Sequence, residues 1–278
     1  ALQVHGDEGD RVTAKWVSQA PDSGHAHYAR GIHLLGAARA ARGPRWASQT
    51  PPEAMRRMSA LIGESIASLE QAIALEPRLL PAYAMLHNAA MFDSREDLER
   101  RAAEAAWAID PACLDMAKQR MEALEPRWGG SYLAMIAFAK ELEPFLAERP
   151  GLAVHVAAPW GDRGDRLVAE DVYTREAAEV LAIAVGKGSN EAHLLDAAEV
   201  AFNRTDAPRD AWMALGHLLQ ATRFREGPRW AEQAIAEQLV RSEPAWSLAR
   251  GLRALASAEA SARAYAPHAH YIVGAAHY

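Results

Sequence analysis

Histidines are the first residues of this chain that could do chemistry, because a His-Ala-His-Tyr segment stands near each end of the sequence. The first contains His25 and His27, and the second contains His268 and His270. Together the two pairs could supply four nitrogen ligands to a zinc ion. Residues two apart on a helix point to different sides, and no Asp or Glu completes a known metal-binding spacing. We therefore expect no metal or other cofactor, and a metal-binding module is kept as an alternative.

Motifs of nucleophilic and hydrolytic catalysis do not occur in the sequence. It contains no Gly-x-Ser-x-Gly, no His-Glu-x-x-His and no Cys–His signature. Cys113, the single cysteine, follows Pro111 at a predicted helix start, where a lowered pKa is conceivable but packing is the usual role. An enzyme remains an alternative in one form, a hydrolase or lyase whose carboxylate–histidine site uses His87 or His217 in a groove.

The segment Trp128-Gly129-Gly130-Ser131 is a candidate anion site, since backbone N–H groups converge where a turn meets a helix N-terminus. The structural interpretation is that the glycines reverse the chain, Trp128 packs in the core and Ser131 caps the next helix. No lysine follows the glycines, which excludes a nucleotide phosphate loop. We favour the structural interpretation.

A surface that binds a partner is the remaining source of function, and His33, Tyr83 and His87 are its candidates. Tyr83 and His87 are four residues apart and therefore share one face of a helix. Such side chains combine apolar contact with a hydrogen bond. We predict that the three residues line a groove for a protein or peptide. The competing interpretation places Tyr83 in the core and His87 on an exposed helix surface.

A repeat of about 34 residues is expected to position these side chains. Pro77 and Pro111 each close a segment, and the residues before them match in register: Glu70, Ala72, Ile73 and Leu75 correspond to Glu104, Ala106, Trp107 and Ile109. Prolines that end helices at this period are typical of helix–turn–helix repeats, whose first helices line the concave side. We predict an all-α fold of antiparallel helix pairs, stacked as a TPR-like α-solenoid and helical over more than half of its residues.

Four regions follow along the chain. Residues 1–24 are predicted to be an N-terminal arm, and 25–143 a TPR-like helical domain. Residues 144–166 are predicted to be an irregular connector, because Leu152, Val154 and Val156 alternate as in a short strand and a Gly/Asp-rich stretch follows. Residues 167–278 are predicted to be a second helical-repeat region packed on the first.

Charge and hydropathy narrow the partners and the location. The chain has 278 residues, a formal net charge of −6 and a pI near 6.0, which argues against nucleic-acid binding. No apolar run is long enough to span a membrane. The sequence starts at Ala1 without a methionine, so we favour a periplasmic or secreted location after signal removal over a cytoplasmic one. The oligomeric state stays open.

A family resemblance is carried by several short motifs between residues 16 and 142. They are Trp16, Ala20-Pro21-Asp22-Ser23, Ala29-Arg30-Gly31 and, most specifically, Leu124-Glu125-Pro126-Arg127-Trp128-Gly129-Gly130-Ser131 with Met135 and Phe138-Ala139. The segment resembles a bacterial family of uncharacterised proteins with a domain-of-unknown-function label and a tetratricopeptide-like helical fold. The resemblance implies that fold and a bacterial source, and it brings no catalytic residue.

These observations favour a non-catalytic helical-repeat protein that binds a partner protein or peptide. A narrower hypothesis is an immunity or adaptor factor in bacterial competition, where many small acidic helical proteins act; it rests on analogy.

Overall fold

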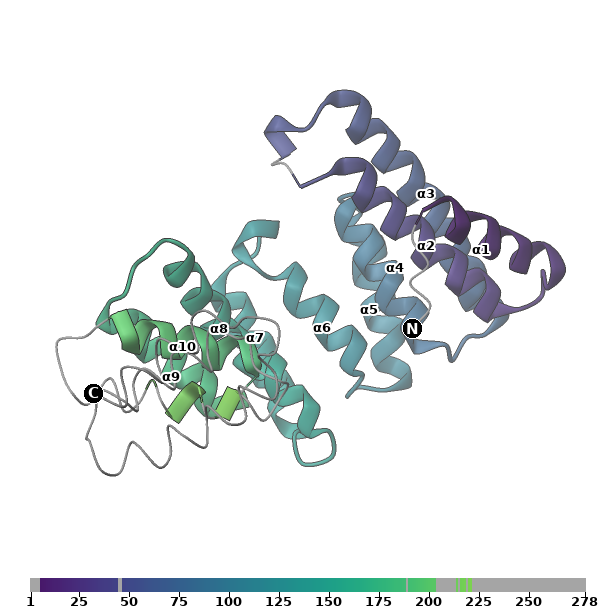
Figure 1. Cartoon of the computed structure of the whole chain (residues 1–278). Helices are drawn as coiled ribbons and strands as arrows, with labels where there is room; N and C mark the ends of the chain where they lie inside the picture. Colours follow the sequence, from purple (N-terminus) through teal and green to yellow (C-terminus); the bar gives the residue numbers. More distant parts are fainter. Residues whose placement is uncertain are drawn as a thin grey trace, which may run out of the picture. The chain divides into compact units, whose positions relative to one another are not determined.

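The computed structural model describes residues 6–44, 47–188 and 190–203, together with 214, 216–218 and 220–221. These residues form α-helices and short 3-10 helices, and none of them lies in a strand, which confirms the all-α prediction (Figure 1). The chain divides into two compact units, Ala1–Leu152 and Ala153–Tyr278. The first contains α1 (Asp7–Gln19), α2 (Gly24–Arg42), α3 (Pro52–Leu75), α4 (Leu80–Phe92), α5 (Glu96–Ile109), α6 (Leu114–Ala123) and α7 (Tyr132–Leu142); the second contains α8 (Ala153–Ala169), α9 (Arg175–Gly188) and α10 (Glu191–Asn203).

The same proline turn follows α1, α3 and α5. The residue before the proline is Ala20, Glu76 or Asp110, with φ between −147° and −132° and ψ between 66° and 102°. A proline removes the α region from the residue before it, so each helix ends at this point. In every copy this residue donates its N–H to the carbonyl four residues earlier and accepts from the N–H three residues later. Helices α1, α3 and α5 are therefore equivalent second helices, and α2, α4 and α6 are first helices.

The predicted register is visible inside the first unit. Ala72 on α3 and Ala106 on α5 are both fully buried, 34 residues apart. Ile73 and Trp107 are both half-buried, and both pack against a core cluster from α4, α5 and the start of α6. The register prediction holds, with less complete burial than expected. The first unit is a stack of antiparallel, tetratricopeptide-like helix pairs.

Helices α2 and α3 make the longest antiparallel pair, and they lie side by side along their length in Figure 1. The contact is close because Gly31 has no side chain: a Cβ placed there would lie 2.6 Å from Cγ of Leu69. Ser65 donates a 2.7 Å hydrogen bond from its Oγ to the Gly31 carbonyl, which satisfies a hydroxyl that is otherwise fully buried.

Gly31→Ala is expected to lower the free energy of unfolding by about 1–3 kcal/mol, the usual cost of overpacking a core. Gly36→Ala is the matched control on the same helix, since a Cβ at Gly36 meets no atom within 4 Å. That control is expected to be neutral or to stabilise by about 0.5–1 kcal/mol through helix propensity. Urea unfolding of both variants measures the difference, and equal stabilities would show that α2 and α3 are not in close contact at Gly31.

The N-terminal segment differs from the predicted arm, because residues 7–19 form helix α1. Asp7, Glu8 and Asp10 stand in its first turn, where carboxylates interact favourably with the helix dipole. Gly9 is its one buried residue among those described. Val12 and Trp16 stand four residues apart on one face of α1, and two such residues are too short a pattern for periodicity to reveal a helix.

The predicted connector differs as well, since α8 runs through the alternating residues and the Gly/Asp-rich stretch. Gly161 and Gly164 give α8 a flat side. Atoms of His193 and Leu181 lie 2.0 Å and 2.4 Å from where Cβ atoms of these glycines would be. The glycines therefore serve close helix packing instead of a loop. Most of the predicted second repeat region, from residue 222 to the end, lies outside the described residues.

None of the helices in the described ranges combines the length and the apolar character that a membrane span needs.

Candidate functional site

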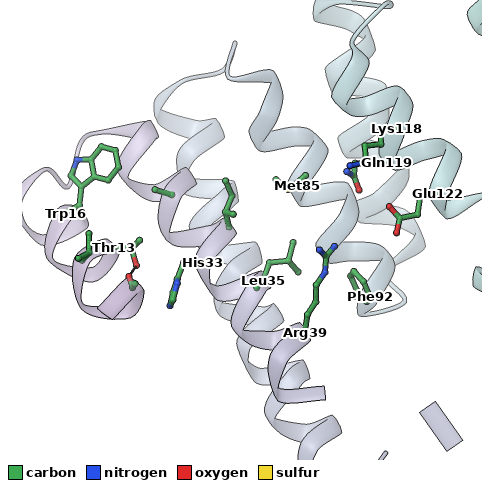
Figure 2. A pocket seen from close by; sticks show the side chains of 15 residues that line it. Thr13, Trp16, His33, Leu35, Arg39, Met85, Phe92, Lys118, Gln119 and Glu122 are labelled. Atoms are coloured by element: carbon green, nitrogen blue, oxygen red, sulfur yellow. Dashed lines mark hydrogen bonds between the residues drawn. The ribbon is translucent and has the colours of Figure 1, made fainter. Parts of the chain in front are cut away.

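A groove of about 570 Å³ crosses the first helices of the first unit (Figure 2). In Figure 2, α1 with Thr13 and Trp16 bounds one side, and α6 with Lys118 and Glu122 bounds the other. Helices α2 and α4 lie between them. We call it the A-helix groove, and its lining residues are Gly9, Val12, Thr13, Trp16, Ala29, Ile32, His33, Leu35, Gly36, Arg39, Met85, Phe92, Lys118, Gln119 and Glu122.

The part of the groove next to α1 is apolar and open to solvent. Val12 is 47% exposed and Trp16 is 38% exposed, although both are large hydrophobic side chains. Ile32 of α2 and Met85 of α4 continue the same lining at intermediate exposure. Exposed apolar side chains that line a hollow mark a surface suited to a partner.

A chain of side-chain hydrogen bonds crosses the groove from α2 to α6. The guanidinium of Arg39 donates to Oδ1 of Asn88, and Nδ2 of Asn88 donates to Oε1 of Gln119 over 2.6 Å. Arginine has no acceptor, so the Asn88 oxygen must face it, and the remaining orientations follow. Asn88 is 1% exposed and Gln119 is 6% exposed, so the bond between α4 and α6 is buried, whereas Arg39 of α2 joins it from the exposed side.

Trp128 supports the floor of the A-helix groove from behind. Its ring meets the Phe92 ring edge-on, with centroids 5.1 Å apart. On the groove side, the Arg39 guanidinium carbon lies 4.8 Å from the Phe92 centroid, a cation–π distance. Trp128 is therefore half-buried against Phe92, a residue that lines the groove, and is not part of the buried core of the first unit.

The rest of the Trp128 turn is built for chain reversal. Gly129 has a φ of 92°, and a Cβ on Gly130 would lie 2.0 Å from the Leu124 carbonyl oxygen. The amides of Trp128, Gly129 and Gly130 are bonded to carbonyls within the turn, so they are not free for an anion. Ser131 accepts a 3.2 Å hydrogen bond from the N–H of Ala134 as the N-cap of α7.

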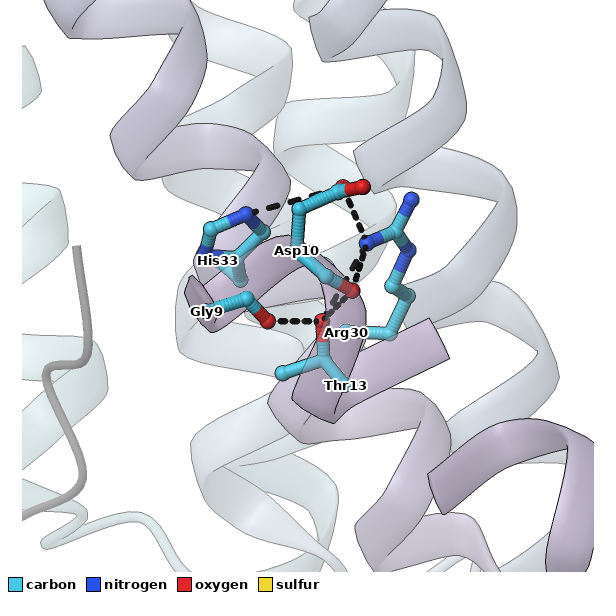
Figure 3. A network of polar contacts seen from close by, with 5 residues as sticks. All are labelled: Gly9, Asp10, Thr13, Arg30 and His33. Atoms are coloured by element: carbon cyan, nitrogen blue, oxygen red, sulfur yellow. Dashed lines mark hydrogen bonds and ion pairs between the residues drawn. The ribbon is translucent and has the colours of Figure 1, made fainter. Parts of the chain in front are cut away.

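A polar network fastens α1 to α2 beside the groove (Figure 3). Nη1 of Arg30 donates to Oδ1 of Asp10 over 2.6 Å and to Oγ1 of Thr13 over 3.2 Å. Oγ1 of Thr13 donates to the Gly9 carbonyl over 2.8 Å. Nε2 of His33 lies 3.7 Å from Oδ1 of Asp10. His33 thus both lines the groove and faces the acid that anchors α1.

We expect Asp10→Asn to loosen α1 while the rest of the first unit stays folded. The ion pair with Arg30 is partly exposed, so its loss costs at most about 1 kcal/mol and raises amide hydrogen exchange in Asp7–Gln19 about five-fold. Asp7→Asn is the control, since it removes the same charge from the same helix turn without touching Arg30. Equal exchange in the two variants would contradict an anchoring role for Asp10.

Tyr83 and His87 do not line the groove, which corrects their predicted placement. Tyr83 is 8% exposed and donates a 2.9 Å hydrogen bond from its hydroxyl to the Pro77 carbonyl. His87 is fully buried, so the competing interpretation was right for Tyr83 and wrong for His87. The reason is that α4 buries eight residues, because it packs on α3, α5 and α6 at once.

A carboxylate–histidine catalytic site at His87 would be closed to substrate. Nε2 of His87 lies 3.6 Å from Oε1 of Glu99, but the side chain is enclosed and neither ring nitrogen has a hydrogen-bond partner in the described structure. Burial, assisted by Arg120, lowers the pKa of His87 to about 4, so the ring is neutral at pH 7 and forms no ion pair. Burial also lowers the pKa of His217, with no carboxylate among the causes.

His25, His27 and Cys113 make ordinary structural contacts. Nδ1 of His25 lies 2.9 Å from Oε1 of Glu76, whereas Nε2 of His27 lies 2.8 Å from the Pro21 carbonyl, so the two rings point to different partners. His268 and His270 lie outside the described residues. Within the described ranges, no three His, Cys, Asp or Glu side chains gather as a metal site requires. Burial raises the pKa of Cys113, opposite to what a reactive thiol needs.

The second unit holds a titratable cluster that sequence reasoning missed. His193 is 8% exposed, and its ring contacts the position where Gly161 leaves room. Asp196, one turn along α10, has its pKa raised to about 7 by burial and by the charges of Asp165 and Glu199. The close contact of His193 with Gly161 gives this cluster a place in the packing of α10 on α8.

Comparisons with known proteins add a partial family match. The family described as "Domain of unknown function (DUF4034)" matches residues 2–100. This agrees with the expected label, but the match covers about a third of the chain and ends before the Leu124–Ser131 signature. No curated protein matches the chain.

Two solved structures share the helical architecture at low identity. The match to a chain in the crystal structure of the APC/C hetero-tetramer Cut9-Hcn1 covers 97% of this chain and 46% of that chain, with 13% sequence identity and a TM-score of 0.41. The match to the crystal structure of yeast Tom70 covers 96% of this chain and 57% of that chain, with 12% sequence identity and a TM-score of 0.45. The chain thus spans about half the length of these two proteins. Likeness at this level says nothing about what the chain binds.

Proposed function

We propose that the chain is a helical-repeat binding protein whose A-helix groove receives a segment of a partner polypeptide. The observation that carries the proposal is the groove itself, lined by three successive first helices and flanked by exposed Val12 and Trp16. A hollow of this size accommodates a few side chains, which suits an extended or helical peptide better than a whole folded surface.

The arrangement of the groove supports selective binding. Trp16 offers a rigid aromatic surface, and aromatic residues with arginine dominate the binding energy of many interfaces. The Arg39–Asn88–Gln119 chain, buried at its two amides, fixes the spacing of α2, α4 and α6, so little ordering is needed when a ligand arrives. An immunity or adaptor role in bacterial competition is a narrower form of this proposal and awaits a partner.

Selection from a random 12-residue peptide library displayed on phage tests the groove directly. Peptides selected on the wild-type protein are expected to lose at least ten-fold in affinity for Trp16→Ala, as at a binding hot spot. Leu133→Ala is the matched control, because Leu133 is 80% exposed on α7 outside the groove. Selected peptides that bind both variants like the wild type would remove the groove from consideration.

A further inference from the structure

We infer that the α6 side of the A-helix groove binds a carboxylate, supplied by an Asp or Glu side chain of an otherwise apolar peptide; this rests on the proposed function. The hydrogen-bond chain across the groove has one direction. Arg39 donates to Asn88, and Asn88 donates to Gln119. Both amide oxygens in the chain are therefore already used as acceptors.

The ends of this chain are consequently donors. Arg39 retains further N–H groups, and the Gln119 amide nitrogen remains as a donor because its oxygen faces Asn88. Lys118, next to Gln119 on α6, adds an ammonium group with three donors. A ligand group that meets Arg39, Lys118 or the Gln119 nitrogen must accept hydrogen bonds, and an ionised acceptor makes the stronger ones.

The charges that line the groove also favour an acidic ligand group. Arg39 and Lys118 line the groove, and neither has a carboxylate partner within the described part of the chain. Glu122 is the one acid among the groove residues, one turn after Lys118, so the lining carries two fixed cations against one anion. This local excess of positive charge stands in a chain whose net charge is −6. A carboxylate complements it, and an arginine- or lysine-rich segment does not.

The apolar part of the groove determines which other side chains the ligand must carry. Val12 belongs to α1, as Trp16 does, and Figure 2 shows Trp16 on the side of the groove opposite Lys118 of α6, with Arg39 of α2 between them. A bound segment must place apolar side chains toward α1 and an acid toward α6. The ligand class is therefore an apolar peptide with an acidic residue at one fixed position.

Composition and affinity of the phage-selected peptides test this inference separately from the groove. The expected result is enrichment of Asp or Glu at one position, with at least ten-fold weaker binding after the acid is replaced by its amide. The double variant Arg39→Met and Lys118→Met should abolish the preference for acid over amide. Arg101→Met with Lys140→Met is the control, since it removes two exposed cations of the first unit outside the groove and should leave the preference intact.

Three outcomes are distinguishable. Acid enrichment that disappears in the Arg39/Lys118 variant alone supports the inference. Peptides that depend on Trp16 but bind equally as acid and amide overturn the carboxylate site and leave the groove standing. Peptides indifferent to both Trp16 and the two cations overturn the proposed function and the inference that rests on it.

Discussion

Trp107→Ala is expected to lower the free energy of unfolding by about 3 kcal/mol, the lower end of the range for deleting a large aromatic side chain. The Trp107 ring lies 5.6 Å from the Phe138 ring, tilted by 43°, and packs on the cluster that contains Met116. It therefore joins α5 to both α6 and α7. Its half-buried position explains why the lower end applies.

Urea unfolding followed by circular dichroism measures this loss. Leu133→Ala is again the control, because a side chain 80% exposed contributes less than about 0.5 kcal/mol when removed. A loss below about 1 kcal/mol for Trp107→Ala would show that the ring does not pack as a repeat residue.

The second large effect is a loss of stability in mild acid that depends on His87. Its folded pKa of about 4 lies below the ordinary value, so the stability it contributes is present above the unfolded pKa and is lost as the pH falls toward 4. Between pH 7 and pH 5 the unfolded chain takes up a proton that the folded chain excludes. The expected loss over this interval is about 2 kcal/mol.

Glu99 does not account for this loss. Burial raises its pKa, so its own contribution is lost as the pH rises, in the opposite direction. His87→Met, of similar size and without the unpaired ring nitrogens, is expected to lack about 2 kcal/mol of the pH dependence and to be as stable as the wild type at pH 7. His25→Gln changes an exposed histidine, so this variant should lose the same stability as the wild type between pH 7 and pH 5. An unchanged pH dependence in His87→Met would refute the assignment.

The sequence by itself determined the class of fold and the repeat register. Pro77 and Pro111 end helices through a local effect on the residue before them, so their spacing shows the period without any knowledge of packing. The same holds for Ser131 as a helix cap. Both features depend only on residues a few positions away, so they can be recognised from the sequence alone.

Tertiary structure decided which side chains meet. Helix α4 is apolar around most of its circumference, so no pattern could tell that His87 turns inward and Met85 toward the groove. The sequence predicted a loop at Gly161 and Gly164, because glycine is common in turns as well as at close helix contacts and the sequence alone does not distinguish these roles. Only the packing of α9 and α10 on α8 shows that these glycines serve helix contact.

The groove shows the same limit most clearly. Arg39 and Asn88 are 49 residues apart, and Asn88 and Gln119 are 31 apart, so no local spacing announces their hydrogen bonds. They meet because stacked pairs bring α2, α4 and α6 side by side. His33 was singled out from the sequence because it lies on a first helix. Its partner Asp10 was not, because the apolar face of α1 is too short to mark that segment as a helix.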